Sequence, residues 1–418
     1  MIMHGTLNRL GSWGRLMGIL NSRFSILNSL LVPGLLLAEC ARERRLPLIN
    51  TPLQRGGVRV AQLFNRFNGF HYVGRSVWKV LGLALLLLAA VLPGRGAEGP
   101  YHFLKEIQVG GEGGWDYLSV DEIGRRLYVT HNTKVLVIGL DKQELAGEIA
   151  DTPGVHGFAL APALGRGFSS NGREAKASIV DLKTLKTLAE VETGENPDAI
   201  LYEAGQQEVY TFNGRGHSAT VFKATSGKVV ANIPLSGKPE FAVAEPKAGR
   251  VYCNIEDKNE IAAIDTRTHQ VVNTWPIAPG EEASGMAIDL EHHRLFIGCN
   301  NKLMEMIDSN NGKVIASVPI GEGVDANAFD PGTRFAFSST GEGTVTVARE
   351  DTPEKLTVIQ TLKTERGART MALDPRTHNI YLAAAKYEAS QEQPSGGGQQ
   401  RPRMVPGSFK ILVYGMEK

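Results

Sequence analysis

Short runs of bulky apolar residues alternate with polar turns along the chain after about residue 100. The segment from Gly237 to Ile277 shows this pattern clearly, because Pro246 and Gly249 separate two β-favouring runs. Each run has the length of an ordinary strand in a sheet. The segment therefore predicts four strands, at Phe241–Ala244, Arg250–Asn254, Glu260–Asp265 and Val271–Pro276.

The second of these predicted strands belongs to a phrase that recurs seven times. The first copy reads RRLYVTH, and successive copies are 40 to 45 residues apart. Self-similarity at this period is typical of a β-propeller, in which each repeat forms one four-stranded blade that needs a neighbour on either side. The chain is therefore predicted to be all-β, a seven-bladed propeller. The phrases centre on Tyr128, Phe168, Tyr210, Tyr252, Phe296, Ala336 and Tyr381.

The last repeat supplies only three strands, at Thr370–Asp374, Asn379–Ala384 and Phe409–Tyr414. The segment His102–Val109 resembles the fourth strands of the other repeats and precedes the first complete one. We expect this N-terminal strand to pair with the C-terminal blade, because that pairing closes the ring and removes a free sheet edge.

A Gly-, Pro- and Gln-rich insertion, residues 387–408, interrupts the last blade between its second and third strands. Its composition predicts a flexible, solvated segment. Two interpretations remain open, a surface loop and a mobile flap over one face of the disc.

The repeats resemble those of the YVTN family of β-propellers. The resemblance rests on the LYVTH phrase around Tyr128, on strand ends such as IAAID at Asp265, and on the tripeptides NPD and KPE that end at Asp198 and Glu240. It covers residues 110–418. It implies seven blades and little about chemistry, because propellers of this kind serve as binding proteins, surface proteins and enzyme modules alike.

The N-terminal part of the chain differs in composition from the propeller, predicted to span residues 101–418. Residues 76–97 contain a basic start and an apolar run of 13 residues, Val80–Leu92, which indicates a signal peptide or an uncleaved membrane anchor. Residues 1–75 are Arg-rich and have no sustained period, so they are predicted to be a non-native or disordered extension, with translation starting further downstream. The protein is therefore expected to be extracytoplasmic, either periplasmic or secreted, and to meet a membrane only through that anchor.

The charge is divided unevenly along the chain. Residues 1–97 carry 12 Lys and Arg but only two acids, whereas the remainder has 33 bases against 42 acids, a formal charge of −9. An acidic body repels phosphate backbones, so nucleic acid is not an expected partner. Cys253 and Cys299 are expected to be buried thiols, and the sequence has no cysteine spacing typical of a metal site.

Charged residues occupy one equivalent position in most of the repeats. The first strand of each blade lines the central channel of a propeller, so equivalent positions converge on one ring. The position five residues before the end of this strand holds four acids, a His, a Ser and an Arg. Carboxylates that face one mouth repel each other, which raises their proton affinity or attracts a cation. The candidate ligand-binding residues are Asp116, His156, Asp198, Glu240, Asp325 and Arg369, and Ser284 completes the ring.

Several functions fit this ring. The favoured interpretation is a non-enzymatic module that binds a small polar ligand or a peptide at the channel mouth. The ring could equally be a solvated rim in which Arg369 and His156 partly neutralise the acids. By resemblance to lactonase-type propellers, it could hold a divalent metal for hydrolysis, although an Arg in the ring disfavours a cation. A structural cell-envelope protein remains a further alternative. No cofactor other than such a metal is expected, and Trp115 is expected either at the ligand rim or in the core.

Overall fold

The computed structural model describes residues 99–388 and 403–416. The predicted extension (1–75), the predicted signal or anchor segment (76–97) and most of the insertion lie outside these residues. Within the described part of the chain, no helix is long and apolar enough to span a membrane.

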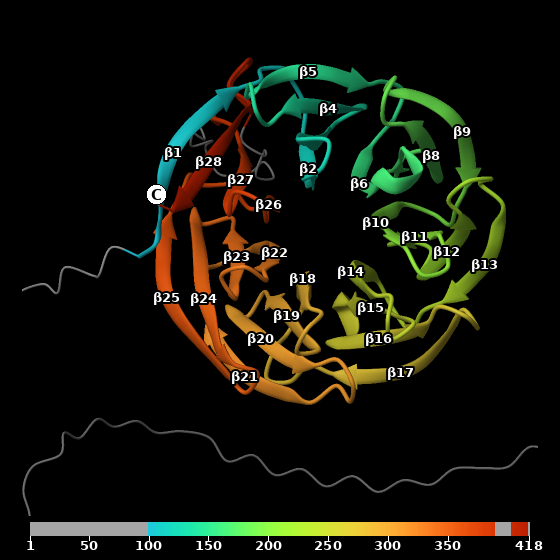
Figure 1. Ribbon diagram of the computed structural model, residues 1–418, viewed down its shortest axis with the longest axis vertical. Coiled ribbons are helices and arrows are strands. Elements are labelled where there is room, and N and C mark those ends of the chain that lie inside the picture. The colour runs from blue at the N-terminus through green and yellow to red at the C-terminus, as the bar shows by residue number, and fades with distance from the viewer. Residues whose placement is uncertain (1–98, 389–402, 417–418) are drawn as a thin grey trace, which may run out of the picture. The chain divides into compact units, whose positions relative to one another are not determined.

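The described residues form seven four-stranded antiparallel sheets arranged around one axis, as the repeat period predicts (Figure 1). The first blade contains β2 (Trp115–Asp121), β3 (Arg126–His131), β4 (Lys134–Gly139) and β5 (Glu144–Ile149), and the second contains β6 (Val155–Ala161), β7 (Arg166–Asn171), β8 (Lys176–Asp181) and β9 (Lys186–Glu192). The third contains β10 (Pro197–Glu203), β11 (Glu208–Asn213), β12 (Ser218–Lys223) and β13 (Val229–Pro234), and the fourth contains β14 (Pro239–Glu245), β15 (Arg250–Ile255), β16 (Glu260–Asp265) and β17 (Gln270–Pro276).

The remaining blades follow the same order from the axis outward. The fifth contains β18 (Ala283–Asp289), β19 (Arg294–Cys299), β20 (Leu303–Asp308) and β21 (Val314–Pro319), and the sixth contains β22 (Val324–Asp330), β23 (Phe335–Thr340), β24 (Thr344–Thr352) and β25 (Lys355–Lys363). The seventh contains β26 (Met371–Asp374), β27 (Asn379–Ala384), β28 (Lys410–Met416) and, as its outer strand, β1 (Tyr101–Gln108). Two 3-10 turns, η1 (Pro162–Leu164) and η2 (Glu256–Lys258), complete the described elements.

The N-terminal strand closes the ring. β1 pairs antiparallel with β28, from Tyr101 opposite Met416 to Gln108 opposite Lys410. Figure 1 shows β1 lying outside β28 and next to the sixth blade. Tyr101 is buried, and its hydroxyl donates to the carbonyl oxygen of His378 at 2.6 Å. The strand therefore joins the two ends of the propeller through buried contacts as well as backbone hydrogen bonds.

The apolar core lies between neighbouring blades. Tyr128, at the centre of the first repeat phrase, is fully buried and stacks on Phe158 of the next blade with ring centroids 4.8 Å apart. Phe296 stacks on Phe329 in the same way at 4.9 Å. The aromatic residues of the repeat therefore serve packing between blades, because each sheet buries one face against each neighbour.

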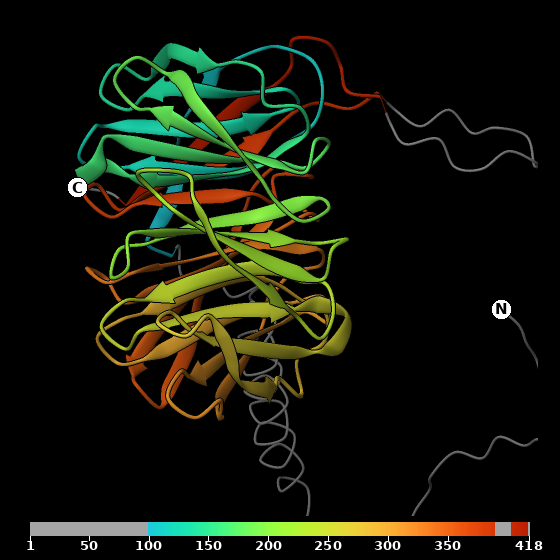
Figure 2. The same cartoon turned by 90° about the vertical axis from the view of Figure 1, so that its right-hand side faces the viewer.

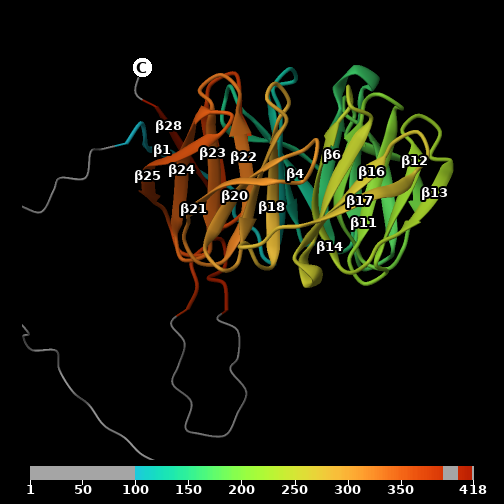
Figure 3. The ribbon, with the colours of Figure 1, turned by 90° about the horizontal axis from the view of Figure 1, so that it is seen from below.

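The stem of the insertion projects from one face of the disc, as the edge-on views show (Figures 2 and 3). β27 and β28 flank it, and Tyr387 forms an isolated antiparallel bridge with Met404. The insertion therefore leaves the face on which second and third strands are connected. Cys253 and Cys299, in β15 and β19, are buried free thiols.

Candidate functional site

A β-bulge recurs near the start of the innermost strand in six blades. The register between the first two strands shifts between Trp115 and Leu118 in the first blade, and between Pro197 and Ile200 in the third. Corresponding shifts occur in the second, fourth, fifth and sixth blades. A bulge leaves a residue unpaired and redirects its side chain. The ring residue of each of these blades lies within the bulge.

The structure brings the sequence-predicted residues together at the axis. In six blades the ring residue is the second residue of the innermost strand, and these residues are Asp116, His156, Asp198, Glu240, Ser284 and Asp325. Arg369 lies two residues before β26, which starts later than the other innermost strands. The innermost strands surround the axis of the ring in Figure 1.

His156 connects two carboxylates of the ring. Its Nδ1 lies 2.7 Å from Oδ2 of Asp116 and 3.6 Å from Oδ1 of Asp198. Burial works against protonation of His156, but the hydrogen bond to Asp116 and the charge of Asp198 raise its pKa to about 9. His156 is therefore a cation at neutral pH, placed between two acids of neighbouring blades.

The other two acids also have basic partners. Arg369 Nε lies 3.0 Å from Oδ2 of Asp325, and Lys238 Nζ lies 2.9 Å from Oε2 of Glu240. Lys238 also forms an ion pair with Glu256. Arg369 is 58% exposed at its side chain, so it can turn toward a ligand at little cost in packing.

Burial keeps a share of the ring carboxylates protonated near neutral pH. Burial, together with the charge of neighbouring carboxylates and against that of nearby cations, raises the pKa of Asp198 and of Asp325 to about 6 and that of Glu240 to about 7. Burial also raises the pKa of Asp116, against the hydrogen bond from His156. If a cationic group bound among these side chains, the carboxyl groups would release their protons, and the resulting carboxylates would attract the cation.

Two aromatic rings meet across the channel beside the charged ring. Tyr117 of the first blade and Phe241 of the fourth are edge to face, with centroids 5.2 Å apart. The equivalent residues of the other five blades are Gly157, Ala199, Gly285, Ala326 and Thr370. A Cβ on Gly285 would come within 2.6 Å of the backbone nitrogen of Asn327, so small residues are required where the innermost strands approach closely. Burial first, and then the charge of all four ring carboxylates, raises the pKa of Tyr117.

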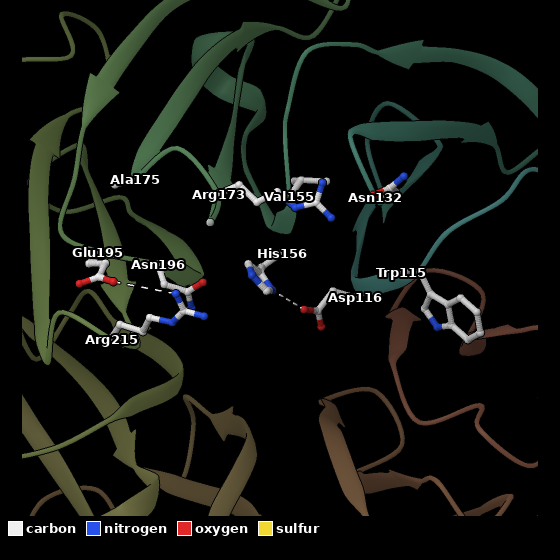
Figure 4. Close-up of a pocket in the computed structure, with 13 residues that line it drawn as sticks. Trp115, Asp116, Asn132, Val155, His156, Arg173, Ala175, Glu195, Asn196 and Arg215 are labelled. Atoms are coloured by element: carbon white, nitrogen blue, oxygen red, sulfur yellow. Dashed lines mark hydrogen bonds and ion pairs between the residues drawn. The ribbon is translucent and has the colours of Figure 1, made fainter. Parts of the chain in front are cut away.

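A cavity of about 550 Å³ opens from the ring toward one face of the propeller. Asp116 and His156 lie within it and point toward one another (Figure 4). Arg173 and Arg215 reach the same cavity from the turns between second and third strands of the second and third blades. Arg215 has a distant acidic neighbour, Glu195, at 3.9 Å. The cavity is therefore lined by one ring acid, Asp116, by the imidazolium of His156 and by the two arginines.

Trp115 lies at the cavity and also packs against aromatic residues of the seventh blade. Its side chain lines the cavity, and its ring packs on Phe409 at 5.0 Å and on Tyr387 at 6.5 Å. Tyr387 belongs to the stem of the insertion. The insertion is thus anchored at the same face as the cavity.

Sequence reasoning missed several of these residues. It did not include Lys238, Tyr117, Arg173 or Arg215. Tyr117 and Phe241 could have been noticed, because they are the only aromatic residues at a repeat position that is otherwise small. The arginines carry no such signal, since their turns differ in sequence from blade to blade.

Asp116, His156 and Asp198 have the donor chemistry of a metal site. One ligand atom from each lies within 4.8 Å of the others. An imidazole with two carboxylates suits a divalent transition metal, and the adjoining cavity leaves room for water or substrate. In this structure the same atoms are instead joined by a hydrogen bond and ion pairs.

Comparison with known proteins supports the fold and leaves the function open. No family model matches the chain, and no curated protein matches it in sequence. The fold is similar to that of 1864 chains of known structure. One is hydrazine synthase of Kuenenia stuttgartiensis, with a TM-score of 0.59 and 16% sequence identity over 67% of this chain and 96% of that chain. A likeness at this identity shows the propeller fold alone, and membership of the YVTN family stays a prediction.

Proposed function

We propose that the propeller binds a small polar ligand, or the end of a peptide, at the channel mouth. The observation that carries this proposal is the convergence of bulge-positioned charged residues at the axis, two of which, Asp116 and His156, line one cavity. Concave sites with a few convergent polar groups of perturbed pKa are the usual form of small-molecule sites. Partly protonated carboxylates would receive a cationic group, and Arg173 and Arg215 would meet an anionic one.

A thermal-shift screen with amino acids, dipeptides, diamines and dicarboxylates tests this proposal. A ligand of the site should raise the melting temperature of the wild-type protein and should do so much less in Asp198→Asn, which removes one ring charge at nearly constant volume. Asp265→Asn is the matched control, because Asp265 ends β16, outside the ring, and accepts backbone N–H groups of the turn that follows. A shift that persists unchanged in Asp198→Asn would place binding elsewhere, and no shift with any compound would refute binding of these classes.

A metal-assisted hydrolase is the second candidate, favoured by the clustering of Asp116, His156 and Asp198. There a divalent metal would supply an activated water in the cavity. Purified protein that retains stoichiometric metal and hydrolyses a lactone or ester, with both lost in His156→Gln, would support the enzyme. Metal-free protein that still binds a ligand would favour the binding module.

The export of the protein is also a proposal. It rests on the apolar run Val80–Leu92 and its basic start. N-terminal sequencing of protein recovered from outside the cytoplasm should yield a chain that begins near residue 97. A mature chain that contains residues 1–70 would contradict both export by this signal and the downstream start of translation.

A further inference from the structure

Buried carboxylates end the innermost strands on the face opposite the cavity. Three of the six pair with a cation of the neighbouring blade. His378 Nδ1 lies 2.6 Å from Oδ2 of Asp330, and Arg125 Nη1 lies 2.8 Å from Oδ2 of Asp374. Such pairs join consecutive blades, and they provide the pattern against which one boundary differs. These carboxylates are Asp121, Glu203, Glu245, Asp289, Asp330 and Asp374.

At the boundary between the fifth and sixth blades, three side chains that could bind a metal ion lie together, whereas the pairs described above contain one carboxylate and one cation. Asp289 ends β18, His292 lies in the turn that follows, and Glu350 comes from β24 of the next blade. His292 Nδ1 is 2.6 Å from Oδ2 of Asp289 and 3.7 Å from Oε1 of Glu350. One ligand atom from each residue lies within 4.8 Å of the others. Figure 1 shows β18 beside the sheet that contains β24.

Glu350 is the anomalous member. Its side chain is 0% exposed, yet neither carboxylate oxygen accepts a hydrogen bond from a nitrogen or hydroxyl donor among the described residues, and the carboxyl group of Asp289 is its close polar neighbour. By contrast, the buried Glu245 accepts hydrogen bonds from Tyr252 and Ser309 at one oxygen and pairs with His293 at the other. Buried carboxylates are normally satisfied, so the open oxygens of Glu350 call for a further partner.

A backbone N–H group holds the outer oxygen of Asp289, and a guanidinium group lies near the outer oxygen of Glu350 without a hydrogen bond to it. The backbone N–H of Glu291 donates to Oδ1 of Asp289 at 2.9 Å. Arg334 Nη2 lies 3.5 Å from Oε2 of Glu350, and the Arg334 side chain is partly exposed. These contacts leave Oδ2 of Asp289 and Oε1 of Glu350 on the side of His292. Metal-binding carboxylates commonly have their second oxygen held in this way.

We propose that Asp289, His292 and Glu350 bind a divalent transition metal such as Zn²⁺ between the fifth and sixth blades. Two carboxylates and one imidazole suit this class of ion, and water would fill the remaining position because His292 is 25% exposed. With metal–ligand distances of about 2.1 Å, Asp289 and His292 would move apart by less than ~1 Å. The site lies on the face opposite the cavity and is independent of the proposed ligand site.

The test measures zinc binding by equilibrium dialysis and the melting temperature with and without ZnCl₂. Wild-type protein should bind zinc here and melt at a higher temperature, since a metal that binds only the folded state stabilises it. His292→Gln and Glu350→Gln should each weaken this binding about tenfold or more and abolish the thermal shift. His378→Gln is the matched control, because it removes an imidazole from an equivalent blade boundary that lacks the third ligand.

A second control, His156→Gln, distinguishes zinc binding at Asp289, His292 and Glu350 from zinc binding at the cluster beside the cavity. Zinc binding that survives in His156→Gln and disappears in His292→Gln supports the proposal. The absence of zinc binding in the wild type, or binding that is lost in His156→Gln and unchanged in His292→Gln, overturns it. If Glu350→Gln does not fold, His292→Gln still decides, because His292 lies on a partly exposed turn. With Co²⁺ in place of Zn²⁺, a visible absorption band lost in His292→Gln would identify the imidazole as a ligand.

Discussion

At the scale of single residues, the ring stores unfavourable charge that depends on pH. Burial raises the pKa of Asp198 from 3.8 to about 6. Between these values the unfolded chain has lost this proton while the folded chain still holds it. The contribution of Asp198 to the free energy of unfolding is therefore fully present below about pH 4, and it is lost as the pH rises through about 6. A shift of this size corresponds to about 3 kcal/mol at most, because Asp198 also interacts with His156.

Asp198→Asn should flatten this part of the stability profile. The free energy of unfolding of the wild type should fall between pH 4 and pH 7, and that of the variant should fall less, by up to about 3 kcal/mol. Denaturant unfolding at a series of pH values measures the difference. Asp265→Asn should change the pH dependence of stability in the opposite direction. Backbone hydrogen bonds lower the pKa of Asp265, so the stability that Asp265 contributes is lost as the pH falls. Parallel profiles for wild type and Asp198→Asn would show that the ring is not strained at neutral pH.

The ring itself could be predicted from the sequence, whereas its pairing could not. The repeat fixes which residue of each blade faces the axis, so Asp116, His156 and Asp325 could be aligned without coordinates. Which acid pairs with which base depends on side-chain direction at the bulge and on turns outside the repeat. The partnership of Lys238 with Glu240 and Glu256 is of this second kind.

At the scale of elements, the sequence located the strands well and placed several of their ends one or two residues away from the observed ones. β16 (Glu260–Asp265) has the predicted bounds, and β27 (Asn379–Ala384) does too. β14 begins at Pro239 instead of Phe241, because Pro239 pairs with Ile255 on the far side of the bulge. The sequence Lys-Pro-Glu at this point is typical of a turn, so a later start of the strand is predicted. The closing strand is displaced by one residue from its predicted range, within the ordinary uncertainty of strand ends.

The closing strand should depend on Tyr101. Its ring packs edge to face on Phe337 at 5.2 Å, and Gln360 exchanges hydrogen bonds with its backbone. Tyr101→Ala should lower the free energy of unfolding by about 3–5 kcal/mol, because it leaves a cavity at the ring closure. Tyr101→Phe, which loses only the hydroxyl, should cost about 1 kcal/mol.

Denaturant unfolding checks these values, with Phe103→Ala as the control on the same strand. Phe103 is 52% exposed, so its removal should change stability far less than that of Tyr101. Equal effects of Tyr101→Ala and Phe103→Ala would mean that β1 does not close the ring through its buried face.

At the scale of the whole molecule, closing seven similar sheets around one axis creates a single place where every blade contributes one side chain. The same symmetry explains why fold alone does not assign function: any set of residues can occupy those positions. In this chain the second blade supplies an imidazole and the first, third, fourth and sixth supply acids. Two aromatic rings, Tyr117 and Phe241, meet beside these charged groups, and two of the charged groups, Asp116 and His156, line the cavity.

Phe241→Ala tests whether this aromatic contact keeps the ring partly dry. Loss of the ring opposite Tyr117 should admit water from the second face, reduce the burial that raises the carboxylate pKa values, and weaken the fall of stability between pH 4 and pH 7. The cost in stability should be about 2–4 kcal/mol, because Phe241 is only partly buried. Phe241→Leu keeps most of the volume and should preserve the pH profile. If Phe241→Ala retains the wild-type profile, the raised pKa values must come from repulsion among the acids, and a cation would then be the ligand group that the ring attracts most strongly.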